Sequence, residues 1–124
     1  MTYLDTAAAV WLHDGKLELF TARALEQIEA DELLISPMLL LELQLLFEIG
    51  RLREAPESIA GALQSDFQVS LGELSFAAVI AQARSMTWTR DPFDRIIAGQ
   101  AAAHRASLIT PDRQIREHFP GAVW

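Results

Sequence analysis

Five acidic residues follow short apolar runs or open helical segments, and together they could hold a divalent cation. They are Asp5, Glu42, Asp91, Asp94 and Asp112. Carboxylate oxygens are the ligands that hard cations such as Mg²⁺ and Mn²⁺ prefer. The chain contains no cysteine, which excludes thiol catalysis and a thiolate zinc site. The residue types therefore favour a carboxylate site for a hard metal ion.

Each of these carboxylates also has a structural explanation. Asp and Glu near a helix N-terminus cap free N–H groups and interact favourably with the helix dipole. The run Asp91-Pro92-Phe93-Asp94 has the form of a cap, and Asp112 follows Thr110-Pro111 as a first-turn acid. Taken singly, these residues are explained by capping. For Asp5 the sequence leaves capping and metal binding equally open.

Glu42 is harder to explain as a cap. Its neighbours three and four residues away on a helix are all apolar, namely Met38, Leu39, Leu45 and Leu46. An unpaired carboxylate on such a face costs several kcal/mol by desolvation, so it must take up a proton, meet an arginine or bind a cation. Several carboxylates meeting in one pocket would repel one another, which favours a cation over an arginine as the sole partner.

Alternating strands and helices would bring these acids together. Apolar runs predict strands at residues 2–4, 33–36, 67–70, 106–110 and 122–124. Amphipathic patterns and cap signals predict helices at 6–12, 20–30, 37–50, 73–84, 92–104 and 111–118, with a weaker helix ending near residue 64. This order is typical of an α/β protein with a mainly parallel sheet. Ligands bind at the carboxyl ends of such strands, so we expect the acids to meet at one edge.

Composition and charge limit the class of protein. A chain of 124 residues, of which 51% are hydrophobic and 22% charged, predicts one globular domain over residues 1–124. It has no apolar stretch long enough for a bilayer and starts without a basic leader, so we expect a soluble, cytoplasmic protein with no membrane partner. The net charge of −7 argues against nucleic-acid binding by bulk charge. Residues 84–124 nevertheless carry six arginines against four acids and could form a phosphate-tolerant surface.

Four motifs, in order along the chain, carry a family resemblance. They are Tyr-Leu-Asp-Thr at 3–6, Ser-Pro-x4-Glu-Leu at 36–43, Asp-Pro-Phe-Asp-Arg-Ile-Ile-Ala-x-Gln-Ala at 91–101 and Leu-Ile-Thr-x-Asp at 108–112. With these motifs the chain resembles a PIN domain, and more narrowly the VapC-like ribonuclease toxins of bacterial toxin–antitoxin pairs. The resemblance covers essentially the whole chain, and the motif at 91–101 is its most specific part.

The resemblance implies a fold and a set of site residues. The implied fold is a three-layer α/β/α arrangement around a mainly parallel sheet of four to five short strands. The implied catalytic and metal-binding residues, at the family's four acidic positions, are Asp5, Glu42, Asp94 and Asp112. Asp91 is either a further contributor to the metal site or only the N-cap of its helix. The hydroxyls of Thr6 and Thr110 could orient ligands or a bound water.

The resemblance also implies an activity, that of an endoribonuclease dependent on Mg²⁺ or Mn²⁺. One or two cations would activate a water for in-line attack on an RNA phosphodiester. Arginines near the acidic edge could hold RNA phosphates, namely Arg90, Arg95, Arg113 and Arg116. The three histidines are not required as bases and are interpreted as structural.

The resemblance implies protein partners as well: a cognate antitoxin and a second copy of the chain in a homodimer. The helix expected at residues 37–50 is apolar nearly all round, which is more than one buried stripe requires. The surplus could cover a homodimer interface or a groove for the antitoxin.

Two hypotheses from other classes remain open. In a catalytically silent α/β binding domain, the acids would only cap helices. In a receiver-like signalling module, a carboxylate cluster also lies at the edge of a parallel sheet, but that architecture needs an acidic pair after the first strand and a lysine after a late one. This chain has a single Asp at position 5, and its only lysine is Lys16.

Overall fold

A sheet of five short parallel strands forms the centre of the protein. The computed structural model describes all 124 residues. The strands are β1 (Thr2–Leu4), β2 (Leu33–Ile35), β3 (Ser70–Leu71), β4 (Ser107–Ile109) and β5 (Ala122–Val123), in the order β3-β2-β1-β4-β5. All four neighbouring pairs are parallel. The prediction of an α/β protein with a mainly parallel sheet of four to five strands is confirmed.

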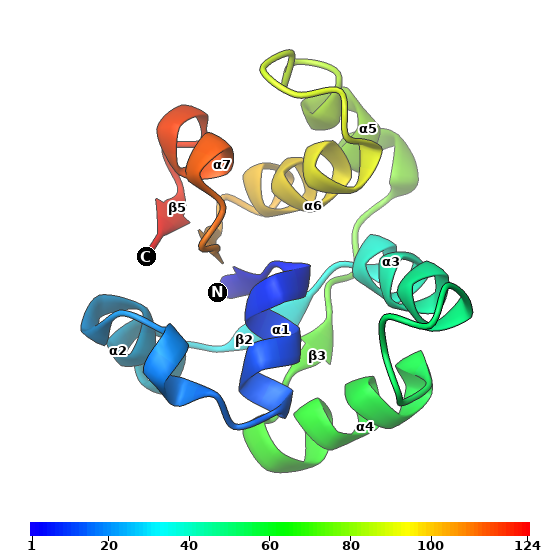
Figure 1. Ribbon diagram of the computed structural model, residues 1–124. Helices are drawn as coiled ribbons and strands as arrows, with labels where there is room; N and C mark the ends of the chain where they lie inside the picture. Colours follow the sequence, from blue (N-terminus) through cyan, green and yellow to red (C-terminus); the bar gives the residue numbers. More distant parts are fainter.

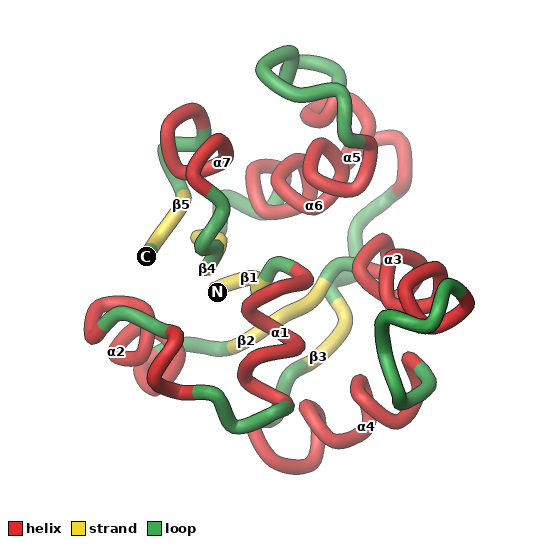
Figure 2. Tube along the Cα trace, in the orientation of Figure 1, coloured by secondary structure: helices red, strands yellow, loops and turns green.

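Helices make the connections, because parallel strands can be joined only by crossovers. They are α1 (Thr6–His13), α2 (Ala22–Ala30), α3 (Pro37–Glu48), α4 (Pro56–Phe67), α5 (Phe76–Ala83), α6 (Pro92–Ala103) and α7 (Arg113–His118), with a short 3₁₀ turn, η1 (Leu17–Leu19). Figure 1 shows α1 passing in front of β2, with α5 and α6 packed together away from it. In Figure 2 the strands lie at the centre and the helices surround them.

Polar side chains start the helices that follow the strands. The Asp5 carboxylate accepts a hydrogen bond from the Ala8 amide at 2.8 Å, and the Ser36 hydroxyl accepts one from the Met38 amide at 3.1 Å. Asp91 and Asp112 cap α6 and α7 in the same way. Each cap satisfies an amide that has no partner inside the helix. The predicted starts of α1, α3 and α6 are confirmed, whereas α7 begins at Arg113, two residues later than predicted, with Asp112 as its cap.

The prediction of a strand at residues 67–70 is wrong. Helix α4 continues to Phe67 and ends at Gln68, whose backbone is left-handed with φ of 55°. The Val69 amide then donates to the Leu63 carbonyl at 3.2 Å, which closes the helix end. Pairing with β2 therefore begins only at Ser70. The next helix also begins later than expected, at Phe76, because the Ser75 hydroxyl caps it.

A buried polar network ties the sheet to α6 and to the start of α3. The Gln100 amide donates to the Gly72 carbonyl at 2.9 Å and accepts a hydrogen bond from the Ser36 hydroxyl at 2.5 Å. The Tyr3 hydroxyl, in contact with Gln100, is also 2.5 Å from Nδ1 of His104. Tyr3 and Ser36 are fully buried, so these bonds replace water for polar groups inside the core. The network fixes α6 against the strands and so sets the position of its N-terminus.

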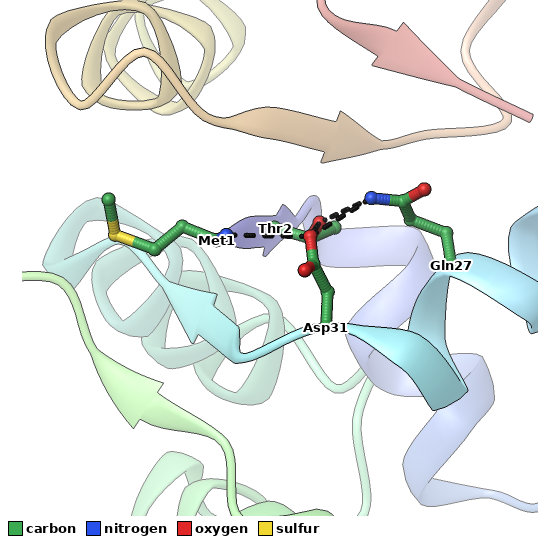
Figure 3. Close-up of polar contacts among 4 residues, drawn as sticks. All are labelled: Met1, Thr2, Gln27 and Asp31. Carbon is green, nitrogen blue, oxygen red and sulfur yellow. Dashed lines mark hydrogen bonds and ion pairs between the residues drawn. The ribbon is translucent and has the colours of Figure 1, made fainter.

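A second polar cluster holds the beginning of β1 to the end of α2 (Figure 3). The Thr2 hydroxyl donates to the Asp31 carboxylate at 2.6 Å, and the Gln27 amide donates to the same carboxylate at 3.0 Å and to the Thr2 hydroxyl at 2.9 Å. The Met1 ammonium lies 3.4 Å from the Asp31 carboxylate. The Thr2 hydrogen bond, with a smaller contribution from the ammonium, lowers the pKa of Asp31. The central strand is thus anchored at the end opposite Asp5.

None of the helices has the length and apolar character that a membrane crossing requires.

We predict that G72A destabilises the protein by about 1–3 kcal/mol because of overpacking. A Cβ atom at residue 72 would lie 2.0 Å from the Tyr3 hydroxyl oxygen and 2.7 Å from two ring carbons, all in the fully buried core. G61A is the matched control, since a Cβ in the middle of α4 meets nothing within 4 Å. It should stabilise the protein by about 0.5–1 kcal/mol, the difference in helix propensity. Urea unfolding of both variants tests this, and equal stability of the two would contradict it.

Candidate active site

Four acidic side chains line one cleft at the carboxyl end of the central strands. The cleft has a volume of about 380 Å³ and is called the carboxylate cleft below. Its acidic residues are Asp5, Glu42, Asp94 and Asp112. The remaining lining residues are Thr6, Ala7, Val10, Trp11, Leu46, Arg51, Leu52, Ile97 and Ile115. The structure therefore brings together the four acids that the sequence analysis singled out.

Asp5 and Asp112 reach the cleft from two neighbouring strands. Asp5 directly follows β1, and its amide donates to the Ile109 carbonyl at the end of β4 at 3.0 Å. Asp112 lies three residues beyond Ile109 and caps α7. The chain runs from β1 to β2 and β3 on one side of β1 and then crosses to β4 on its other side, which makes this a switch point of the sheet. Parallel sheets bind ligands at such points.

Glu42 and Asp94 come from helices that pack on each other. Helix α3 contacts α6, so the second turn of α3 and the first turn of α6 face the same space. The Thr6 hydroxyl donates a hydrogen bond to Glu42, which ties α1 to α3. Leu46, one turn beyond Glu42, forms an apolar part of the cleft wall. Glu42 thus projects from a partly apolar face, as expected.

Burial and mutual repulsion raise the pKa of two of these carboxyls to about 7. Asp5 is only 7% exposed, and desolvation is the main cause of its raised pKa. The charges of Asp112 and Glu42 add to it, while hydrogen bonds from Thr110 and from the Ala8 amide oppose it. For Asp94, desolvation again dominates the raised pKa, and all the other acids of the cleft contribute. The metal-free cleft therefore resists full ionisation at neutral pH.

Glu42 has a raised pKa for the same reason, burial, which the Thr6 hydrogen bond only partly offsets. Asp91 adds repulsion to both Glu42 and Asp94. Asp91 itself is exposed and does not line the cleft, and its Oδ1 accepts from the Phe93 and Asp94 amides. Asp91 therefore caps α6, which is one of the two roles left open for it.

The donor set of the carboxylate cleft suits a hard divalent cation. Four carboxylates face one space, and the only cationic side chain in the lining is Arg51, which forms an ion pair with none of them. Mg²⁺ and Mn²⁺ bind carboxylate oxygens and would offset the repulsion that raises the pKa values. The donor types therefore suit such an ion, although no three of these four side chains have ligand atoms within 4.8 Å of one another in this structure.

The two threonines differ in their contacts. Thr6 lines the cleft and holds Glu42. Thr110 is fully buried; its hydroxyl accepts from the Asp112 amide at 3.0 Å and hydrogen-bonds Asp5. Both hydroxyls thus orient acidic residues of the cleft, one on each side of it.

None of the four arginines singled out from the sequence lines the carboxylate cleft. Arg95 has a structural role instead, because its guanidinium donates to the carbonyls of Ala83, Arg84 and Thr89 at 3.1–3.5 Å. Arg90 is exposed and donates to the Thr87 carbonyl. Arg113 and Arg116 project from α7 into a different cleft. These arginines lie close to the acids in the sequence, but their side chains do not point into the carboxylate cleft.

Arg51 is the cleft residue that the sequence analysis missed. It follows Gly50, whose φ of 79° is left-handed and ends α3, and its amide donates to the Leu46 carbonyl at 2.8 Å. Such a glycine closure turns the chain back over the helix end. The only signal in the sequence was a glycine followed by an arginine after an apolar helix.

The three histidines make their contacts outside the carboxylate cleft. His13 pairs with Glu54 at 2.5 Å, His104 with the Tyr3 hydroxyl, and the ring of His118 stacks on Trp88 with centroids 5.6 Å apart. None of the three lines the carboxylate cleft.

Comparison with known proteins decides the family. The PIN domain family matches residues 2–118 of the chain. The chain belongs to the PIN-domain family. It is 31% identical over 127 residues to Ribonuclease VapC22 of Mycobacterium tuberculosis (strain ATCC 25618 / H37Rv), covering 98% of this chain and 96% of that protein. The expected three-layer PIN fold and the resemblance to VapC-like ribonucleases are both confirmed.

Two solved structures have the same fold. One is a crystal structure of VapBC2 from Rickettsia felis bound to a DNA fragment from their promoter, with a TM-score of 0.66 and 20% identity over 99% of this chain and 96% of that chain. The other is DNA-bound VapBC from Salmonella typhimurium, with a TM-score of 0.61 and 21% identity over 98% and 93%. The receiver-like alternative is wrong, since this is a PIN domain and Lys16 lies outside the cleft.

We predict that the metal-free protein loses stability as the pH rises from about 4 to about 8. Asp5 and Asp94 have pKa values of about 7 in the folded protein against 3.8 for a free side chain. The folded state therefore holds protons that the unfolded state releases, and this contribution is lost as the pH passes 7. Thermal unfolding in EDTA across this range measures it.

D94N should remove part of this pH dependence. At pH 8 we expect it to stabilise the metal-free protein by about 1–2 kcal/mol, after discounting for solvent around the half-buried carboxyl. That corresponds to a rise in Tm of about 3–8 °C. D66N is the matched control, because Asp66 is exposed and outside the cleft. A D94N protein with the pH profile of D66N would contradict the assigned repulsion.

Proposed function

We propose that the protein is a divalent-metal-dependent endoribonuclease that hydrolyses RNA phosphodiester bonds and acts as the toxin of a toxin–antitoxin pair. The observation that carries the proposal is the convergence of four acidic side chains on one cleft of a PIN domain. It is supported by the similarity over the whole chain to a protein named a ribonuclease. A silent binding domain would have no need to gather acids whose burial raises their pKa values.

In this proposal Asp5, Glu42, Asp94 and Asp112 hold one or two Mg²⁺ or Mn²⁺ ions. When bound, such ions would supply Lewis-acid activation of a water and neutralisation of charge at the phosphodiester that is cut. Asp5 is fixed by its cap to α1 and by Thr110, and Glu42 is fixed by Thr6. These hydrogen bonds keep the carboxylates oriented before a ligand arrives, which lowers the reorganisation needed for reaction.

The lining of the cleft favours direct attack by water over a covalent intermediate. Its only side-chain hydroxyl belongs to Thr6, and that hydroxyl already donates to Glu42. The cleft contains no histidine to activate it as a nucleophile. The remaining walls, formed by Val10, Trp11 and Ile97, are apolar and exclude water from one side. Hydrolysis without an enzyme-bound intermediate is the chemistry that this set supports.

We predict that D94N and D5N abolish Mn²⁺-dependent RNA cleavage, lowering the rate by at least about 100-fold. Asn keeps the capping hydrogen bond of Asp5, so D5N removes the charge without removing the helix cap. D66N is again the control for loss of one acid. Cleavage of a labelled RNA is measured with and without EDTA, alongside Mn²⁺ binding by calorimetry.

Wild-type protein that binds no Mn²⁺ and cuts no RNA would overturn the proposed function. A D94N protein that cuts RNA at the wild-type rate in the same Mn²⁺ would overturn the role assigned to Asp94.

We further propose a cognate antitoxin and a homodimer as protein partners in the cytoplasm. Solved structures with this fold are VapBC complexes, which supports the antitoxin. For the homodimer, support comes from apolar side chains left exposed on α3 and α5, above all Leu41, at 49%, and Phe76, at 74%. Both line one apolar cleft between these helices. Exposed apolar area of this kind marks contact surfaces.

We predict that wild-type protein sediments as a dimer and that L41Q/F76Q sediments as a monomer with unchanged Tm. Both side chains are exposed, so their replacement costs the fold little. L17Q, which removes a leucine of similar exposure (47%) from η1, should remain dimeric. Sedimentation velocity at several concentrations checks this, and a wild-type monomer at the highest concentration would remove the homodimer.

A further inference from the structure

Three arginines from two distant segments line a second cleft. Arg23 of α2 and Arg113 and Arg116 of α7 meet beside β5, in a cleft of about 430 Å³ called the arginine cleft below. Its other lining residues are Glu117, Ala122 and Trp124. Figure 1 shows α7 next to β5, with α2 on the same side of the molecule. No part of the proposed catalytic machinery lies in this cleft.

The arginine cleft is a positive region on a negative protein. The chain carries a net charge of −7, yet three of its ten basic residues gather here against one acid. Arg113 pairs with that acid, Glu117, at 3.0 Å, while Arg23 and Arg116 have no ion-pair partner. The Arg113–Glu117 pair is itself well exposed, so it holds Arg113 only weakly. The cleft therefore offers guanidinium donors that an anion can use.

The two clefts share a helix. Asp112 and Ile115, at the start and the middle of α7, line the carboxylate cleft, while Arg113 and Arg116 line the arginine cleft. A helix with its side chains is about 10–12 Å across. A short nucleic-acid strand could therefore reach from one cleft to the other. An aromatic contact also links them, because the ring of Trp11 in the carboxylate cleft lies 6.0 Å from that of Trp124 in the arginine cleft.

We propose that the arginine cleft binds a backbone phosphate of the RNA strand, next to the bond that is cut in the carboxylate cleft. This proposal rests on the proposed function and deepens it by naming a substrate subsite. Guanidinium groups bind phosphate oxygens through paired hydrogen bonds, and such contacts position a strand without reading its sequence. An RNA strand anchored there would cross α7 and present a neighbouring phosphodiester to the four acids.

Separation of the two clefts explains how an acidic protein holds RNA. The carboxylates repel a phosphate until cations are bound, so affinity that does not depend on metal has to come from elsewhere on the surface. Arg23 and Arg116 supply it from positions where they cannot pair with the cleft acids. RNA binding through these residues is therefore separable from metal binding.

The test compares R23Q/R116Q with R53Q/R84Q, a control that removes the same charge from exposed arginines outside both clefts. Binding of a short fluorescein-labelled single-stranded RNA is followed by anisotropy in EDTA, where no cleavage occurs, over a series of salt concentrations. We expect R23Q/R116Q to weaken binding by about 5- to 20-fold. Its salt slope should fall by about 0.7, the contribution of one phosphate contact on a single strand.

The substitution E117Q is expected to change RNA affinity in the opposite direction. It removes the only acid of the arginine cleft and frees Arg113, so RNA should bind more tightly than to the wild type. In Mn²⁺, R23Q/R116Q should raise KM for RNA cleavage, with kcat at saturating RNA and Mn²⁺ affinity unchanged. A purely structural role for these arginines would lower Tm without this split.

The proposal is overturned if R23Q/R116Q and R53Q/R84Q give the same RNA affinity and the same salt slope. Failure of the proposed function has a different signature: wild-type protein would not cut RNA in Mn²⁺, whatever the binding measurements in EDTA give. Single-stranded DNA of the same sequence should lose affinity to the same degree in R23Q/R116Q, since a phosphate contact ignores the sugar. A loss confined to RNA would overturn the phosphate assignment.

Discussion

Repulsion among the carboxylates at the end of β1 and β4 is the constraint on which the site depends. Asp5 is buried, and burial, reinforced by the charges of neighbouring acids, raises the pKa of both Asp5 and Asp94 to about 7. Folding alone would favour apolar residues or an arginine at these positions, because uncompensated buried charge is costly. The rest of the fold must therefore hold these groups in place against their mutual repulsion, and the caps and buried hydrogen bonds do so.

A residue that caps a helix can also line the carboxylate cleft. Asp5 gives one carboxylate oxygen to the Ala8 amide, and Asp112 gives one to the Ile115 amide. Both also line the carboxylate cleft, so each cap sets the orientation of a site residue. From the sequence alone, helix capping and metal binding are alternative roles for each acid. Asp91, which caps α6, differs from the others in its exposed position outside the cleft.

Local signals predicted most of the helices and strands along the chain well, because caps and apolar runs act over a few residues. The four acids could be predicted for the same reason, since each lies just after a strand or within the first turns of a helix at the carboxyl edge of the sheet. The end of α4 could not, because a left-handed Gln68 leaves no clear mark in the sequence. Arg51, Arg23 and Gln100 were missed because their roles depend on segments far away in the chain.

The placement of the arginines follows from the same constraint as the acids. An arginine directed into the carboxylate cleft would form a strong pair with Asp5 or Asp94, lower their pKa values and compete with any cation. Arg95 is instead bound to main-chain carbonyls, and Arg113 and Arg116 lie on the opposite side of α7 from Ile115 and the acids. The net charge of −7 thus conceals two separated regions of opposite sign. Their separation keeps the acids available to a metal ion and the arginines available to phosphate.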